Sequence, residues 1–191
     1  MLANVVVFVS IAVAGGLGSS WYMIERGSAL TTRAQGPWVT WTAAGRTDAD
    51  PYTRAHLARR GVLPLSSTIA LTYEATRDSD GRPLTSGCDY AVEGEDLAAA
   101  WWSLAVYDEA GRLIPNAAER YAYNSATVMR SPGGSFAITL ARDVRPGNWL
   151  PAGSAGRLTL MLSLEEPQGS GAAPDEAGEA ALPRIRRTAC R

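Results

Sequence analysis

The side chains best suited to bind a ligand lie in two irregular segments, one of which reads RPGNWLP. These candidate ligand-binding residues are Arg142, Arg145, Asn148, Trp149, Asn124 and Tyr123. Aromatic faces beside amide and guanidinium groups are suited to sugar or peptide ligands. In the alternative interpretation, Trp149 closes one end of a β-structure while Arg145 and Asn148 form hydrogen bonds with loop carbonyls.

Carboxylate pairs are the main candidates for catalysis. Asp48 lies near Asp50, and Glu93 lies near Glu95 and Asp96. A glycosidase needs two carboxylates at a defined separation, which the sequence does not fix. We find no nucleophile elbow, zinc signature or glycine-rich nucleotide loop, so we predict no metal and no cofactor and assign no catalytic residue.

The charged residues exclude several classes of function. All 18 basic residues are arginine, so a Schiff-base or phosphate-loop lysine is excluded. The net charge of −1 implies no general attraction to nucleic acid. The single histidine, His56, falls in an arginine-rich segment and is expected to be a surface or helix-packing residue.

Cys88 and Cys190 are the only two cysteines of the chain. In an exported domain, an even and minimal count indicates one disulfide. That bond would close a loop of about 100 residues, for which chain entropy gives roughly 4–5 kcal/mol of stabilisation. The alternative is a pair of buried or unrelated thiols.

Alternating apolar residues predict that these side chains are carried mainly by β-strands. In WWSLAVY, Trp102, Leu104 and Val106 share one face, and leucines alternate in the same way over residues 158–164. Turn sequences such as DEAG and SPGG separate the strands. Seven or eight short strands suggest a sandwich or barrel. One soluble helix is expected over about residues 51–60, with Asp50 as its N-cap and Gly61 after its end.

The first 24 residues are expected to form a membrane anchor. Residues 2–24 carry no charge, and about 20 helical residues span the hydrocarbon of a bilayer. Trp21 and Tyr22 resemble an interfacial aromatic belt. A cleaved signal peptide is the alternative, although no basic residue precedes Glu25. We expect a connector at 25–47, a β-sandwich domain at 48–191, and a mobile loop at 166–181.

Small residues recur at every fourth position of the apolar segment. Ala12, Gly16 and Ser20 form this row and would let another membrane helix approach closely. The alternative is that small residues are simply common near the ends of export signals.

Several motifs resemble the domain-of-unknown-function family 1214. They are DADPYTRAHLARRGVLPL, WWSLAVYDEAGRLIPN, YAYNSATV, RPGNWLPAG and LPRIRRTAC. They occur in the family's order from about Trp38 to Cys190. The resemblance implies a jelly-roll-like antiparallel β-sandwich. It also implies a link to family 1254, which is often fused to this family or encoded beside it.

Two functions follow as hypotheses. The first is a non-catalytic cell-envelope module that binds a partner protein, such as a family 1254 protein, or an envelope glycan. The second is an envelope carbohydrate-active hydrolase or lyase. In either case we expect a single-pass protein of the bacterial inner membrane with its C-terminal domain in the periplasm. We expect no nucleic-acid partner.

Overall fold

The computed structural model describes residues 1–167 and 181–191, which divide into two compact units. Unit 1 contains residues 1–33 and 41–66, and unit 2 contains residues 34–40 and the described residues from 67 onwards. The predicted mobile loop at 166–181 lies almost entirely outside the described residues.

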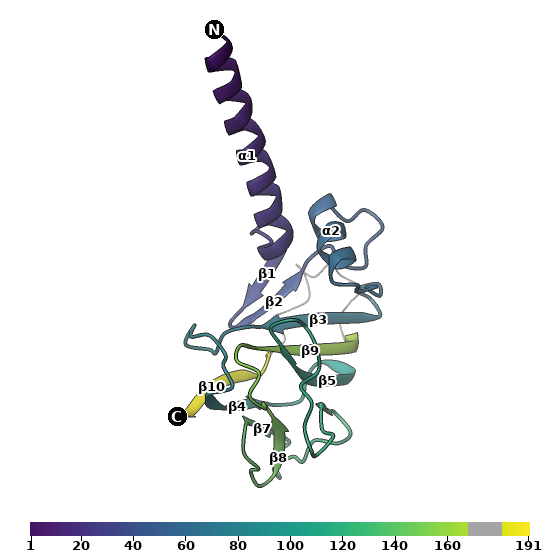
Figure 1. Cartoon of the computed structure of the whole chain (residues 1–191). Helices are drawn as coiled ribbons and strands as arrows, with labels where there is room; N and C mark the ends of the chain where they lie inside the picture. Colours follow the sequence, from purple (N-terminus) through teal and green to yellow (C-terminus); the bar gives the residue numbers. More distant parts are fainter. Residues whose placement is uncertain (168–180) are drawn as a thin grey trace. The chain divides into compact units, whose positions relative to one another are not determined.

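Unit 1 contains two helices, α1 (Leu2–Arg26) and α2 (Pro51–Arg59) (Figure 1). α1 has no buried residue and is long and apolar enough to cross a membrane. A helix with these properties near an N-terminus is either a membrane anchor or a signal sequence.

The predicted N-cap of α2 is confirmed. The Asp50 carboxylate accepts hydrogen bonds from the backbone amides of Tyr52 and Thr53 at 2.9 and 3.0 Å. Burial raises the pKa of Asp50, but the hydrogen bonds from the Thr53 hydroxyl and from these amides outweigh it, so the net pKa is lowered. At the other end Gly61 has φ +63°, the left-handed conformation expected after the helix.

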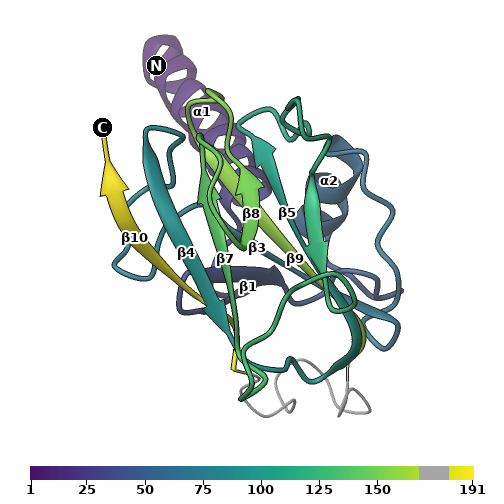
Figure 2. The same cartoon turned by 90° about the horizontal axis from the view of Figure 1, so that it is seen from below.

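Unit 2 is mainly β and sandwich-like, with two sheets (Figure 2). The larger sheet has, in spatial order, β1 (Thr32–Gln35), β2 (Trp38–Trp41), β3 (Ala70–Ala75), β9 (Leu158–Pro167), β5 (Ala99–Asp108) and β6 (Ala122–Asn124). The smaller sheet has β10 (Arg184–Cys190), β4 (Cys88–Gly94), β7 (Phe136–Ala141) and β8 (Asn148–Pro151). The chain passes between the two units within β1 and β2.

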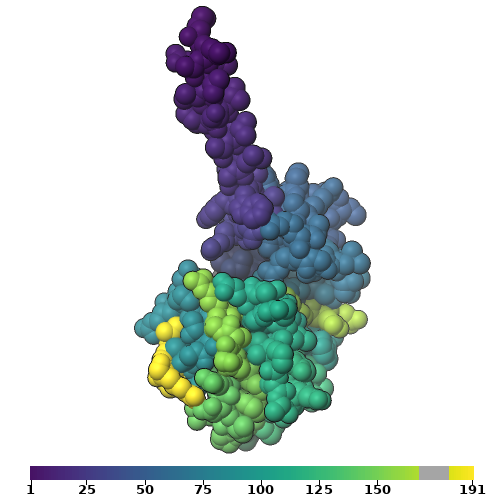
Figure 3. All heavy atoms as spheres, viewed as in Figure 1, coloured from purple at the N-terminus to yellow at the C-terminus, as the bar shows by residue number. Residues whose placement is uncertain are grey.

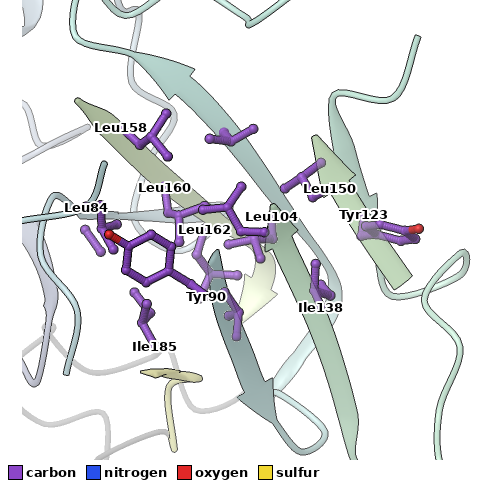
Figure 4. Close-up of a cluster of buried hydrophobic side chains, with 14 of the residues drawn as sticks. Leu84, Tyr90, Leu104, Tyr123, Ile138, Leu150, Leu158, Leu160, Leu162 and Ile185 are labelled. Atoms are coloured by element: carbon purple, nitrogen blue, oxygen red, sulfur yellow. The ribbon is translucent and has the colours of Figure 1, made fainter. Parts of the chain in front are cut away.

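The core of unit 2 is formed by the alternating faces that the sequence predicts. Trp102, Leu104 and Val106 of β5 are buried, as are the four leucines of β9. Figure 4 shows Leu158, Leu160 and Leu162 in one cluster with Tyr90 of β4 and Ile138 of β7. Each sheet therefore supplies one wall of the core.

One strand pairing departs from the predicted antiparallel arrangement. β7 and β8 run parallel, with Ile138 opposite Asn148 and Leu140 opposite Leu150. Parallel neighbours usually need a long crossover connection, but here only residues 142–147 lie between the strands. The predicted antiparallel β-sandwich is confirmed, and this pair is a local exception, because the 142–147 loop returns along β7 instead of turning into a hairpin.

Cys88 and Cys190 form the predicted disulfide. The two residues are directly opposite each other at the ends of β4 and β10. The bond joins positions 102 residues apart and fixes the last strand to the edge of the smaller sheet.

We predict that Cys190→Ser lowers the free energy of unfolding by about 4–5 kcal/mol, because the unfolded chain regains the entropy of a loop of about 100 residues. Urea unfolding followed by tryptophan fluorescence measures this change. As a control, a reducing agent should bring the wild type to the midpoint of the variant and leave the variant unchanged. Equal midpoints for the oxidised wild type and the variant would contradict the prediction.

Candidate functional site

The 142–147 loop is held to the smaller sheet by two ion pairs. Arg145 Nη2 lies 2.5 Å from Asp89 Oδ2, and Asp89 is a largely buried residue of β4. Arg191 donates from Nη2 to the carboxylate of Asp143. Both contacts lie next to the Cys88–Cys190 disulfide in the sequence, so the covalent link and the ion pairs fix the same end of the sheet. In Figure 3 the C-terminal end (yellow) and the β7–β8 region (green) appear on the same face.

The Asp143–Arg191 pair shifts the titration of both groups. The hydrogen bond from Arg191 lowers the pKa of the Asp143 carboxyl, and the charges of Arg191, Arg145 and Arg142 lower it further. The same hydrogen bond raises the pKa of Arg191. The loop is therefore a cationic segment in which Asp143 stays ionised into moderately acidic solution.

Asn148 is buried, and its side chain forms three hydrogen bonds with backbone groups. Its Oδ1 accepts from the Met129 amide at 2.7 Å. Its Nδ2 donates to the carbonyls of Met129 and Ala137 at 2.8 and 3.1 Å. The amide thus supplies the hydrogen bonds that an adjacent strand would otherwise provide. This agrees with the alternative interpretation of the sequence, in which Asn148 bonds to backbone carbonyls instead of to a ligand.

Arg120 connects two predicted site residues, Trp149 and Tyr123. Its Nη1 donates to the Trp149 carbonyl at 3.2 Å, and its guanidinium carbon lies 5.6 Å from the centroid of the Tyr123 ring. The Trp149 indole is buried and donates from Nε1 to the Ala141 carbonyl at 3.0 Å. Both aromatic rings are therefore packed into the fold and do not form a flat exposed face.

Asn124 has a local role in the turn that follows β6. Its Oδ1 accepts from the amides of Ala126 and Thr127 at 3.0 and 2.9 Å. This turn leads the chain towards Met129, where the backbone meets Asn148. Asn124 therefore helps to place the segment beside β8.

The exposed part of the 142–147 loop is centred on Arg142 and Val144. Val144 is 75% exposed, and Arg142 is exposed without a hydrogen bond or ion pair to any described residue. Of the two predicted ligand-binding arginines, Arg145 is paired with Asp89, whereas Arg142 presents its charge to solvent. A ligand for these residues stays a prediction.

Sequence reasoning missed the partners that fix the loop, Asp89, Asp143, Arg191 and Arg120. Asp89 follows Cys88, and Arg191 follows Cys190. The predicted disulfide could therefore have shown that Asp89 and Arg191 lie at the same end of the sheet.

The predicted packing row on α1 lies on an uncovered helix surface. Ala12 and Gly16 are exposed, Ser20 is partly exposed, and a Cβ at Gly16 would meet nothing within 4 Å. The neighbouring Ser19 hydroxyl donates to the Gly16 carbonyl at 3.1 Å, so it is satisfied within the helix. Among the residues that the structure describes, nothing else occupies this row.

A sequence model of the family described as "Protein of unknown function (DUF1214)" matches residues 69–169. That range covers 101 of the 191 residues, and it includes β3, β9 and the 142–147 loop. The chain belongs to the DUF1214 family. Its resemblance to the family, seen in motifs such as RPGNWLPAG, is thereby confirmed. No curated protein matches the chain.

Two solved structures are similar to parts of this chain. The crystal structure of the VPA0106 protein from Vibrio parahaemolyticus has a TM-score of 0.60 and 18% sequence identity, over 74% of this chain and 36% of that chain. An uncharacterized protein from Burkholderia cenocepacia has a TM-score of 0.47 and 15% identity, over 92% of this chain and 41% of that chain. This DUF1214 chain thus spans well under half the length of either.

We predict that Asn148→Asp lowers the free energy of unfolding by about 3 kcal/mol at neutral pH. The carboxylate keeps the bond from the Met129 amide but places an unpaired charge against two carbonyl oxygens. Urea unfolding measures the loss, and Arg142→Gln, in the loop that precedes Asn148, should change stability by no more than about 0.5 kcal/mol. An Asn148→Asp protein as stable as the wild type would show that these hydrogen bonds do not hold the loop.

We also predict that Arg191→Gln raises the pKa of Asp143 towards its ordinary range, as NMR titration of the carboxyl carbon would measure. Because the folded-state pKa lies below the unfolded value of about 3.9, the pair contributes stability above that value. The contribution is lost as the pH falls through the lower, folded-state pKa. Arg184→Gln, at the start of β10 and outside this pair, is the control and should leave Asp143 unchanged.

Proposed function

We propose that this DUF1214 chain is a membrane-anchored, non-catalytic module of the cell envelope that binds another protein through the 142–147 loop. The observation that carries the proposal is the way this loop is built. Two ion pairs and the buried Asn148 hold it, while Val144 and Arg142 stay exposed. A loop that is ordered before binding loses little conformational entropy on association, which favours affinity.

The properties of α1 support anchoring. The helix has 25 residues and no buried side chain, and its length at 1.5 Å per residue exceeds the roughly 30 Å of a bilayer's hydrocarbon. Trp21 and Tyr22 are exposed near its C-terminal end, where an interfacial belt is expected. We infer a single span in the inner membrane with unit 2 in the periplasm.

The disulfide supports the assignment of unit 2 to the periplasm. Disulfides persist in oxidising compartments and are rare in the cytosol. Cys88 and Cys190 pair with each other, and the chain has no further cysteine for redox exchange. A structural role outside the cytoplasm is the simplest explanation for this bond.

The longer relatives support a partner protein. In the V. parahaemolyticus protein the fold shared with this chain occupies 36% of the polypeptide, so it is accompanied there by further protein. We propose that this DUF1214 domain likewise works against another protein component, such as a family 1254 protein. With both components in one membrane, a weak contact would suffice because their effective concentration is high.

A protein ligand is favoured over a glycan because the aromatic candidates are covered. Sugar recognition by stacking needs an accessible ring face. The rings of Trp149 and Tyr123 are buried. The exposed groups of the loop include the aliphatic Val144 and the cationic Arg142, while the exposed Asp143 carboxylate is paired with Arg191. Arginine and apolar side chains together suit a protein surface.

The hydrolase or lyase alternative finds less support, because most of its candidate carboxylates already have partners. Asp48 forms an ion pair with Arg46, and Asp50 caps α2. Glu93 lies 2.5 Å from Arg186, and Asp96 lies 3.1 Å from Arg130. These four carboxylates therefore do not form a facing pair without other partners.

The proposal is tested by recovering the full-length protein, with its bound partners, from detergent-solubilised membranes. Val144→Asp should reduce the recovery of at least one co-purifying protein several-fold, because it places a charge in the proposed interface. Leu113→Asp makes the same chemical change at an exposed apolar side chain of another turn and should leave recovery unchanged. Equal recovery from all three proteins would overturn the docking role of the loop.

The same experiment tests the row on α1. Gly16→Leu should reduce recovery if a partner helix packs on the row, because the larger side chain prevents close approach. Gly18→Leu is the matched control, since Gly18 is equally unobstructed but lies outside the row. A mature protein that lacks α1 would instead show that the helix is a cleaved signal sequence and would remove the anchoring part of the proposal.

A further inference from the structure

The C-terminal end of α1 is joined to α2 by three contacts within unit 1, one made by His56 and two by Arg59. The His56 ring is stacked on Trp41, with 4.1 Å between ring centroids, and its Nδ1 lies 2.7 Å from the Ile24 carbonyl oxygen. Because a carbonyl can only accept, Nδ1 carries the proton and donates it. Ile24 lies in the last turn of α1, where carbonyls lack partners within the helix. His56 is thus a packing residue that caps α1.

Arg59 supplies the other two of these contacts. Its guanidinium forms an ion pair with Glu25 at 2.5 Å and lies 4.2 Å from the centroid of the Trp21 ring. Trp21 lies about one turn closer to the middle of α1 than Ile24 does. The contacts of α2 with α1 therefore extend from Trp21, in the aromatic belt, to Glu25 near the end of the helix.

The 61–65 loop follows directly and is apolar, exposed and ordered. Val62, Leu63 and Leu65 are 45, 91 and 56% exposed. The amides of Gly61 and Val62 donate to the carbonyls of Ala58 and Leu57, a Schellman motif that fixes the exit of the chain from α2. Gly45 has φ +75° and packs so closely that a Cβ there would lie 1.8 Å from the Leu65 carbonyl oxygen. The loop is therefore held from both ends while its leucines face outwards.

The charge of this segment suits an anionic surface. From Pro51 to Tyr73 the sequence has three arginines, Arg54, Arg59 and Arg60, and no aspartate or glutamate. With Glu25, which pairs with Arg59, included, two positive charges remain in excess. Basic residues close to a bilayer are attracted by anionic phospholipids, with about 1 kcal/mol for each residue near the surface. Exposed leucines beside arginines are typical of segments that lie in a membrane interface.

We propose that the 61–65 loop is a second membrane contact, with Val62, Leu63 and Leu65 inserted in the interfacial region of the same bilayer that α1 spans. The inference rests on the proposed anchoring by α1. The occupant is lipid rather than protein, because Arg59 lies against Trp21, a residue of the aromatic belt that marks the membrane interface, and the 61–65 loop follows Arg59 directly. Insertion of about 5–10 Å, typical of interfacial segments, would bury the exposed side chains.

The test uses the full chain reconstituted in vesicles of phosphatidylcholine and phosphatidylglycerol. Leu63→Cys is labelled with the environment-sensitive dye NBD, and the vesicles carry a nitroxide quencher on the acyl chains near the headgroups. We expect a blue-shifted emission that the nitroxide lipid quenches. Thr47→Cys is the matched control, since it is an exposed residue of the same unit that precedes the opposite end of α2, and its dye should show the emission of water.

A second variant tests whether the apolar side chains cause the insertion. Leu65→Asp, with the dye still at position 63, should reduce the quenching, because a carboxylate in the interface opposes insertion of the loop. Mass spectrometry of the unreduced protein confirms that Cys88 and Cys190 remain paired in each labelled sample.

Three results would overturn the inference. If the protein floats with the vesicles on a density gradient but the dye at position 63 has a water-like emission without quenching, the loop does not contact lipid. If the emission is blue-shifted, insensitive to nitroxide lipid and dependent on the protein-to-lipid ratio, the leucines contact protein instead. If the protein does not float at all, the proposed anchoring by α1 fails, and this inference fails with it.

Discussion

The leucine face of β9 is the contact on which the rest of unit 2 depends. β9 pairs with β3 on one side and β5 on the other, so its backbone groups are satisfied while its leucines are buried against β4 and β7. Truncating one buried leucine typically costs 2–5 kcal/mol, whereas an exposed ion pair contributes about 0–1 kcal/mol. Burial of apolar surface therefore determines the fold, and the ion pairs position the loops on it.

The parallel pairing of β7 and β8 explains why so many polar side chains gather around the 142–147 loop. The loop must return along β7 in six residues, and it lies outside the ladders in which the backbone groups of strands are hydrogen-bonded. Side chains provide the hydrogen bonds and ion pairs here instead. Asn148 pairs with Met129 and Ala137, the Trp149 indole pairs with Ala141, and Arg145 is held by Asp89. Most of the polar side chains that suggest a binding site in the sequence thus hold the 142–147 loop and β8 in place.

Local patterns in the sequence predicted the local features of the fold. Alternation identified the buried faces of β5 and β9, the Asp50-Pro51 pair identified the start of α2, and the cysteine count identified the disulfide. Each of these depends on residues close together in the chain or on a choice among very few partners. Sequence spacing carried no such information for Arg145 and Asp89, 56 residues apart, or for His56 and Ile24, 32 residues apart. The parallel pairing was missed because the Pro146-Gly147 turn also suits a hairpin.

The disulfide has a topological consequence for what a protease can release from this chain. The bond closes a covalent ring that contains every residue from Cys88 to Cys190, and therefore all strands from β4 to β10. A protease that cuts one peptide bond inside this ring opens it without separating the two fragments. Both pieces remain covalently attached to residues 1–87, and so to α1. A single cleavage between the two cysteines would therefore leave the folded unit tethered, and only reduction together with unfolding would release the C-terminal fragment.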